Sequence, residues 1–362
     1  MNRIPFNQAE IDNAIDVPGF LGATTKKYQT PITPKENYRL VYERKTPLWL
    51  PIGGDSLTFN PRIDPDNVAR CFCFEANPLT PEEYVGGLDK FGIEWVYVPV
   101  AAGSMVKPGN PMLDDANNWK KVMKFPDIET WDWEASKAAN ADFLNTDRFI
   151  SIMIMTGFFE RLISLMDFDK AAMAMIDEDQ QDAVHELFDA LADLYIKMID
   201  KYIENYGIDL LTFHDDWGSQ RAPFFSLATA REMIVPHLKK VTDHCHASGI
   251  FFEMHSCGKN ELLVPAYIEA GCDSWNGQGM NDKEMIYEKY GDQIILGMDS
   301  GLPFVFGGGA EISKEEAEAA AMSFIGKFCP DYATKPVIPS GFGVPADFIR
   351  VLYEESRKVF NQ

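Results

Sequence analysis

The chain has 362 residues, 46% of them hydrophobic, which suits one large domain or two average ones with a well-packed core. Its 55 acidic residues outnumber its 33 basic ones and give a formal net charge of −22. Because phosphate backbones and anionic membrane surfaces bind clustered Lys and Arg, this balance argues against nucleic acid and membrane as partners.

Residues 1–40 do not fit the pattern of the rest of the chain and are predicted to form an N-terminal arm. They contain no apolar stretch long enough for a signal peptide, and no run of about 18 apolar residues occurs in the sequence. The six cysteines are scattered through a large chain, which favours reduced thiols over a disulfide framework. We therefore expect a cytoplasmic protein.

Residues 41–362 alternate between apolar segments and helical segments, and this α/β pattern predicts a single (β/α)8 TIM barrel domain. The expected strands are 48–52, 94–100, 149–155, 209–214, 250–255, 273–278, 293–299 and 335–340. The expected helices include 80–91, 177–207, 227–249, 260–271, 282–291 and 313–328. Residues 101–148 interrupt the alternation and are predicted to be an insertion.

Polar residues gather where the expected strands end, which is where TIM barrels carry their catalytic groups. Asp215, Asp216 and Asp299 are candidate catalytic acids. For Asp215 and Asp216, loop caps or partners that orient a ligand are the alternative. The candidates for substrate binding are His214, Trp217, Gln220, Trp275 and Gln278. The two tryptophans would stack on a planar substrate or, alternatively, fill the top of the barrel.

The segment FFEMHSCGKN (251–260) places three potential metal ligands at alternate positions. Because alternate side chains of a strand share one face, Glu253, His255 and Cys257 are expected to point the same way. We predict that they bind a metal ion. The alternative is a hydrogen-bonded core histidine beside a buried thiol.

The runs HDDWGSQ (214–220) and HSCGKN (255–260), with the residues that follow as far as DSG (299–301), resemble the uroporphyrinogen decarboxylase-like superfamily, in its cobalamin-dependent methyltransferase branch. The resemblance spans roughly residues 35–360. It implies a His-x-Cys pair that holds zinc together with a thiolate near the end of the last strand. His255 and Cys257 match the pair, but Ser340 stands where that cysteine is implied. The remaining ligands would come from Glu253, Gln278, Asp299 or Cys272.

The resemblance further implies an enzyme that transfers methyl groups. Zinc with a single thiolate keeps net positive charge, which suits the polarisation of an ether oxygen. We therefore expect O-demethylation, in which a methyl group passes from a methoxylated small molecule, such as an aryl methyl ether, to a partner corrinoid protein that carries cobalamin. The alternatives are a methylcorrinoid:thiol methyltransferase with a zinc-activated thiol, and a non-catalytic barrel that binds a ligand or a partner. A homodimer is one expected assembly.

Decarboxylation of uroporphyrinogen is disfavoured. The decarboxylases share an arginine-bearing RQAGRY segment near the first strand, whereas residues 53–72 read GGDSLTFNPRIDPDNVARCF and contain Arg62 and Arg70 without the motif. A substrate with many carboxylates also fits poorly beside an acidic mouth.

Overall fold

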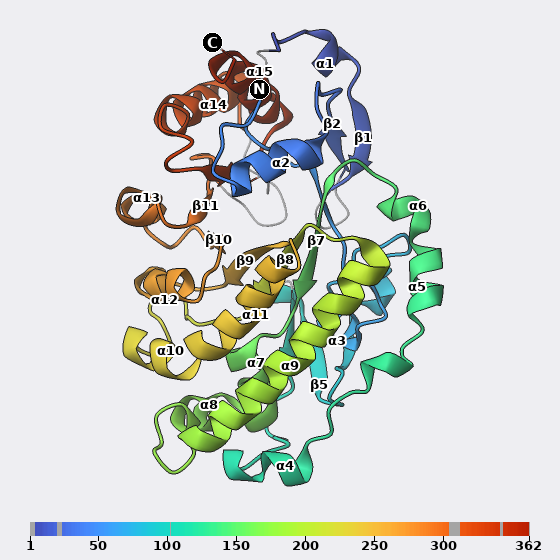
Figure 1. The fold of residues 1–362 in the computed structure, drawn as a ribbon, viewed down its shortest axis with the longest axis vertical. Helices are drawn as coiled ribbons and strands as arrows, with labels where there is room; N and C mark the ends of the chain where they lie inside the picture. The colour runs from blue at the N-terminus through green and yellow to red at the C-terminus, as the bar shows by residue number, and fades with distance from the viewer. Residues whose placement is uncertain (1–3, 20–23, 102, 304–311, 341–342, 362) are drawn as a thin grey trace. The chain divides into compact units, whose positions relative to one another are not determined.

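The computed structural model describes residues 4–19, 24–101, 103–303, 312–340 and 343–361 (Figure 1). The chain forms two compact units. The first consists of residues 1–58, 147–150 and 273–362, and the second of residues 59–146 and 151–272. Within the described ranges, no helix has the length and apolar character needed to cross a membrane.

The N-terminal part of the first unit contains a hairpin between two short helices. The elements are α1 (Ala9–Asp12), β1 (Ile15–Pro18), β2 (Thr24–Lys27) and α2 (Pro34–Tyr42), and β1 pairs with β2 antiparallel. Arg357 of the C-terminal helix α15 (Ala346–Val359) is buried and bonds to Glu10 at 2.9 Å. The beginning of the chain is therefore tied to its last helix.

The remainder of the first unit follows the expected alternation of strands and helices. Its parallel strands are β10 (Ser274–Gly277), β11 (Ile295–Met298) and β12 (Val337–Pro339). Its helices are α13 (Lys283–Tyr290), α14 (Lys314–Phe328) and α15. Ser313 and Glu316 form a capping box at the beginning of α14, where the sequence predicts a helix.

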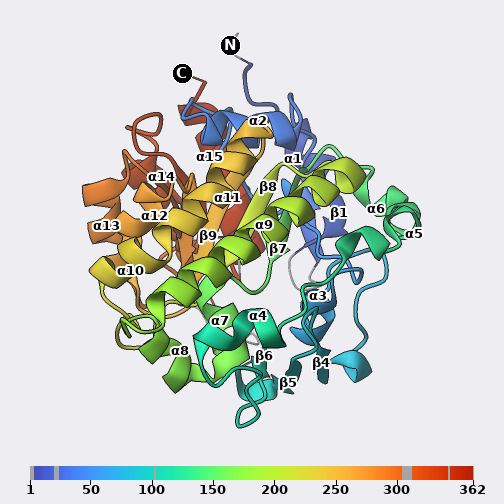
Figure 2. The same ribbon diagram turned by 60° about the horizontal axis from the view of Figure 1, so that its bottom comes forward.

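The second unit is built around three parallel strands, which are β7 (Phe149–Ile154, mostly in this unit), β8 (Leu210–His214) and β9 (Phe251–Ser256). The helices between and after them are α7 (Phe158–Met166), α8 (Phe168–Ala174), α9 (Gln181–Tyr206), α10 (Leu227–Met233), α11 (Val235–Ala247) and α12 (Val264–Glu269). Helices α9 and α11 run side by side (Figures 1 and 2). Helix α9 ends at Gly207, which has a left-handed conformation with a φ of 63°.

The parallel strands are ordered β12-β11-β10 in the first unit and β9-β8-β7 in the second. The first unit also contains the short strand β3 (Ser56–Thr58). The prediction of an α/β fold with a parallel sheet is confirmed, and this order is compatible with a barrel-like fold. Six of the eight expected strands occur among these parallel strands. Closure into a complete eight-stranded barrel stays a prediction, as does the domain boundary at residue 40.

The predicted helix at 80–91 is wrong. The segment instead contains the 3-10 turn Pro81–Glu83 and strand β4 (Gly86–Leu88), which joins β5 (Glu94–Val98) and β6 (Gly103–Val106) in an antiparallel sheet. Gly86 has a φ of 95°, and a Cβ atom there would lie 2.1 Å from the carbonyl oxygen of Trp95. Only glycine allows the two strands to approach this closely. The expected strand at 94–100 therefore exists, but outside the parallel sheet.

The predicted strand at 48–52 is also wrong, although Trp49 and Leu50 are fully buried. Side chains of the first unit satisfy the backbone N–H groups that a strand would pair with a neighbour. Leu48 donates to Asn37, Leu50 to Ser356, and Ile52 to Asp55. The segment is therefore buried like a strand but has no hydrogen-bonded neighbouring strand, which explains why its apolar sequence led to the wrong prediction.

The predicted insertion contains several short elements after β6. They are α4 (Trp119–Val122), α5 (Trp133–Ala139) and α6 (Ala141–Leu144), together with 3-10 turns at 116–118 and 128–130. Residues up to 146 belong to the second unit. Helix α3 (Pro65–Ala69), which precedes the antiparallel sheet, belongs to the same unit.

A histidine pair joins α9 and α11, with Nδ1 of His185 lying 3.0 Å from Nε2 of His237. Burial, together with the charges of His185 and Lys240 and against the opposing charge of Asp189, lowers the pKa of His237 to about 4. The folded state therefore binds fewer protons at this residue than the unfolded state, whose histidine titrates near 6.5. Stability from the neutral His237 is complete above that pH and is lost as the pH falls toward 4.

We expect the free energy of unfolding to fall below about pH 6.5 with a contribution of up to about 1.4 kcal/mol per pH unit from this proton. Urea denaturation at a series of pH values would measure the slope. The variant His237→Gln, which cannot titrate, should lose that part of the slope. An equal slope in the variant and the native protein would contradict the expectation.

Candidate metal centre

Two histidines meet at the C-terminal ends of adjacent parallel strands. In the register of β8 and β9, Thr212 lies opposite Glu253, and His214 lies opposite His255. The two imidazole rings are stacked, with their centroids 5.2 Å apart and an angle of 21° between the ring planes. The C-terminal strand edge of the second unit therefore presents a pair of imidazoles.

Cys257 follows the end of β9 and completes a compact group with these histidines. Its Sγ atom lies 3.6 Å from Nε2 of His255. One donor atom from each of His214, His255 and Cys257 lies within 4.8 Å of the others. Of the six cysteines, Cys257 is the one that is not fully buried. A second group of donors within the same distance consists of Glu160, His214 and Asp216.

Contacts between the loops that follow β8 and β9 fix the position of Cys257. The Asp216 carboxylate accepts a hydrogen bond of 2.7 Å from the N–H of Cys257, and Lys259 donates its N–H to the carbonyl of Ser219. Gly258 has a φ of 84°, and a Cβ atom there would lie 2.1 Å from the carbonyl oxygen of Gly218. The glycine of the HSCG sequence is therefore needed for the two loops to meet.

Helix α7 supplies a carboxylate to the first histidine. Oε2 of Glu160 lies 2.7 Å from Nδ1 of His214. The beginning of α7 is capped by Asp215, which accepts the N–H groups of Phe159 and Glu160 at 3.0 and 2.8 Å. Asp215 also accepts the indole N–H of Trp217 at 2.8 Å. Both oxygens of Asp215 are thus engaged, as the alternative of a structural cap anticipates.

The carboxylates around His214 shift the pKa values of the side chains at this site. Burial alone would lower the pKa of His214, but Glu160 and Asp216 outweigh it and raise that pKa well above its ordinary value. Burial and the charge of Asp216 raise the pKa of the Cys257 thiol, partly offset by His214. Burial raises the pKa of Asp215 to about 7, with a further contribution from Glu160. The two carboxylates therefore favour the protonated imidazole of His214, and burial favours the neutral thiol of Cys257.

Glu253, which the sequence groups with His255 and Cys257, is absent from both donor groups found among the described residues. Glu253 and His255 do share the more exposed face of β9, as predicted. Glu253 stands two residues earlier, about 6.6 Å back along the strand. Its carboxylate accepts a hydrogen bond from Thr212. His214, predicted as a substrate-binding residue, lies instead beside His255 and Cys257.

The other candidates of the second unit differ in exposure. The Trp217 indole is fully buried and packs against Tyr267 and Phe225, in agreement with the packing alternative. Gln220 is exposed in the loop after β8. Cys272 is buried and belongs to neither donor group.

The remaining candidates belong to the first unit. Trp275 is buried, Gln278 is half-buried, and the half-exposed Asp299 forms an ion pair of 2.8 Å with the buried Lys283. Ser340 donates its backbone N–H to the carbonyl of Met298. The roles of Asp299, Trp275 and Gln278 at the site stay predictions.

Glu160 and Arg70 escaped the sequence analysis as site residues. Nη2 of Arg70 lies 3.1 Å from Oε1 of Glu160, and both side chains are largely buried. Glu160 occurs in the helix that follows β7, where a TIM-like fold places functional groups, and this position was the available signal. A histidine at the end of each of two adjacent strands was the corresponding signal for His214.

Comparison with known families assigns the chain to one of them. The model of the family described as uroporphyrinogen decarboxylase (URO-D) matches residues 97–331. The chain belongs to this family. Membership indicates an enzyme and agrees with the resemblance read from the sequence, at the level of the superfamily. No curated protein matches the chain.

Several solved structures share low similarity with the chain. The IOLI protein with a binding zinc atom is 12% identical, with a TM-score of 0.34 over 64% of this chain and 80% of that one. The catalytic domain of the GH26 endo-beta-1,4-mannanase of Bacillus sp. JAMB-750 is 9% identical, with a TM-score of 0.39 over 99% and 95% of the two chains. A putative lyase/mutase from Burkholderia cenocepacia J2315 is 15% identical, with a TM-score of 0.26 over 66% and 80%. TM-scores this low say nothing about the reaction.

Proposed function

We propose that the protein is a corrinoid-dependent methyltransferase that takes a methyl group from a methoxylated small molecule and passes it to a corrinoid protein. Aryl methyl ethers are the first substrate class to test. The observation that carries the proposal is the group formed by His214, His255 and Cys257, which offers two imidazoles and one thiol at a strand edge. Membership of the URO-D family supports an enzymatic function. The C-terminal strand ends, where these residues lie, are also where TIM-like folds place their active sites.

The donor atoms suit zinc. Bond lengths of about 2.3 Å to sulfur and about 2.05 Å to nitrogen, with tetrahedral angles, separate the two ligands by about 3.6 Å. The separation between Sγ of Cys257 and Nε2 of His255 is 3.6 Å. Calcium and magnesium prefer oxygen ligands, so a set of two imidazoles and a thiol disfavours them. His214, His255 and Cys257 would therefore hold zinc.

The number of thiols in the group supports an ether substrate. Zinc at this site would supply a Lewis acid that polarises the ether oxygen. Cys257 contributes one negative charge and the two neutral imidazoles contribute none, so the charge of the ion is only partly neutralised. A site with several thiolates would neutralise it and favour activation of a bound thiol instead.

The protein's own side chains would prepare this site for a cation. Glu160 accepts the proton on Nδ1 of His214, which leaves Nε2 of that ring, on the side of Asp216 and Cys257, as the ligand atom. Asp216 holds the backbone of Cys257 in place. The hydrogen bonds of the two loops thus fix ligands from two different strands.

Engaged arginines give little support to decarboxylation of a polycarboxylate. Arg62 pairs with Glu75 and Glu83, each at 3.0 Å, and Arg70 pairs with Glu160. Neither guanidinium stands free to bind substrate carboxylates.

Metal analysis followed by methyl transfer assays would test the proposal. We expect the purified protein to contain zinc and to transfer methyl groups from some members of a panel of aryl methyl ethers to reduced cobalamin. Cys257→Ser should abolish transfer, whereas Cys245→Ser, which alters a buried thiol of α11, should retain it. Full transfer by protein that is free of zinc would overturn the metal assignment. Transfer from methylcobalamin to thiols, with no ether activity, would instead support the thiol methyltransferase.

A further inference from the structure

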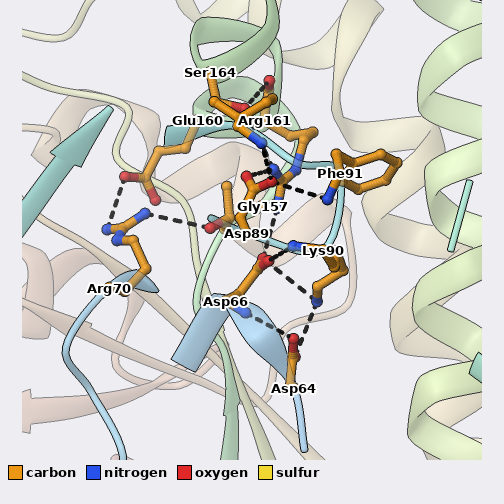
Figure 3. Close-up of polar contacts among 12 residues, drawn as sticks. Asp64, Asp66, Arg70, Asp89, Lys90, Phe91, Gly157, Glu160, Arg161 and Ser164 are labelled. Carbon is orange, nitrogen blue, oxygen red and sulfur yellow. Dashed lines mark hydrogen bonds and ion pairs between the residues drawn. The ribbon is translucent and has the colours of Figure 1, made fainter. Parts of the chain in front are cut away.

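A cluster of five charged side chains is buried in the second unit (Figure 3). Arg161 forms ion pairs with Asp66 at 2.6 Å and with Asp89, and Lys90 forms ion pairs with Asp64 at 2.9 Å and Asp66 at 3.4 Å. All five side chains are at most 1% exposed. Because buried ion pairs give little net stability compared with apolar packing, stability alone does not account for the cluster.

The cluster joins two elements that lead directly to the metal centre. Asp66 belongs to α3, and Arg161 belongs to α7. Arg70 is the residue that ends α3, and Glu160 is the neighbour of Arg161 in α7. The ion pair between Asp66 and Arg161 therefore fixes the two backbones from which Arg70 and Glu160 reach each other.

Three contacts hold the Arg70 guanidinium in place. It pairs with Glu160, donates to Oγ1 of Thr156 at 3.3 Å, and stacks 4.5 Å above the centre of the Trp95 ring. The indole N–H of Trp95 donates to Asp89 of the buried cluster at 2.9 Å. The cluster thus also fixes the ring on which Arg70 lies.

Glu160 divides its two oxygens between the arginine and the histidine. Oε1 faces Arg70 at 3.1 Å, and Oε2 faces Nδ1 of His214 at 2.7 Å (Figure 3 shows the contact with Arg70). A carboxylate held at both oxygens has one orientation, and that orientation defines the plane and the tautomer of the imidazole. Without Arg70, the Glu160 carboxylate would lose one of the two contacts that set its orientation against the ring.

We propose that Arg70 and Glu160 are positioning residues for the metal centre: through them the buried cluster orients His214 for zinc. The inference rests on the proposed zinc site. It adds a role for two residues that are not themselves in the group of His214, His255 and Cys257.

Zinc affinity, measured by competition with a chromophoric chelator, tests this inference independently of methyl transfer. We expect Glu160→Gln to weaken zinc binding by about 10- to 100-fold, the effect typical of a lost partner of a ligating histidine. Arg70→Met should weaken binding in the same direction but less, and Arg70→Lys, which keeps the charge, should recover part of the loss. The matched control is Glu75→Gln, which neutralises a largely buried carboxylate paired with Arg62 in the same unit and should bind zinc as the native protein does.

Substitution of the zinc by cobalt gives a spectroscopic signature that a merely structural role would not change. The d–d absorption of the cobalt protein should shift in Glu160→Gln and in Arg70→Met, while the thiolate-to-cobalt band from Cys257 remains. Native affinity and an unchanged cobalt spectrum in both variants would overturn the inference while leaving the zinc site intact. Native protein that binds zinc at this site but transfers no methyl group would instead overturn the proposed function and leave the inference standing. If Glu160→Gln fails to fold, a native affinity and spectrum in Arg70→Met alone would overturn the inference.

Discussion

Arg161→Met should lower the free energy of unfolding by about 3–5 kcal/mol, because it leaves the buried carboxylates of Asp66 and Asp89 without their main cation. Methionine fills much of the space of the arginine stem, so the loss reflects uncompensated charge more than an empty cavity. Chemical denaturation followed by tryptophan fluorescence would measure the change.

A matched substitution compares the effect of losing a buried arginine on stability with the effect of losing an exposed arginine in the same unit. Arg231 of α10 is 48% exposed and pairs with Glu269 at 2.6 Å. Arg231→Met should change the free energy of unfolding by at most about 1 kcal/mol, as is usual for exposed pairs. Equal effects of the two substitutions would show that the buried cluster does not behave as a set of ionised groups.

His214→Ala should weaken zinc binding by more than about 100-fold, since the loss of an outer partner of a ligand alone costs about 10- to 100-fold. The expectation follows from the position of His214 opposite His255 and within ligand distance of Cys257. Chelator competition and metal content after dialysis would measure the effect.

Glu253→Gln distinguishes the ligand set of the structure from the set read off the sequence. Glu253 lies two residues before His255 in β9 and accepts a hydrogen bond from Thr212. Its substitution should therefore leave the zinc affinity close to that of the native protein. A large loss in Glu253→Gln, with little loss in His214→Ala, would favour the sequence-derived set instead.

Strong local patterns account for the parts of the fold that the sequence predicts. Apolar runs flanked by glycine and polar residues identify β7 to β12, and the capping box at Ser313 identifies the beginning of α14. Such signals depend on neighbours along the chain. They fail at 80–91, where acids after Thr80 are typical of a helix but Gly86 permits a close strand pair with Trp95.

Two of the three residues of the candidate site could be predicted in the same way. Strand alternation and the family resemblance both select His255 and Cys257, which the structure brings together with His214. The third partner required the register between β8 and β9, because it decides which side chains of two strands stand at the same height. Alternation along one strand predicts the face on which Glu253 lies, but not how far along the strand it lies from the donor atoms of the neighbouring strand.

The sequence by itself determined the alternating α/β pattern, the acidic surface charge and the HSC segment at a strand end, because periodicity, composition and spacing are local properties of the chain. Only the tertiary structure decided that Glu160 contacts His214 and that Arg70 contacts Glu160. Arg70 and Glu160 are 90 residues apart, and no periodicity links them. A buried ion pair between α3 and α7 accompanies their contact, and such pairing follows from packing in three dimensions.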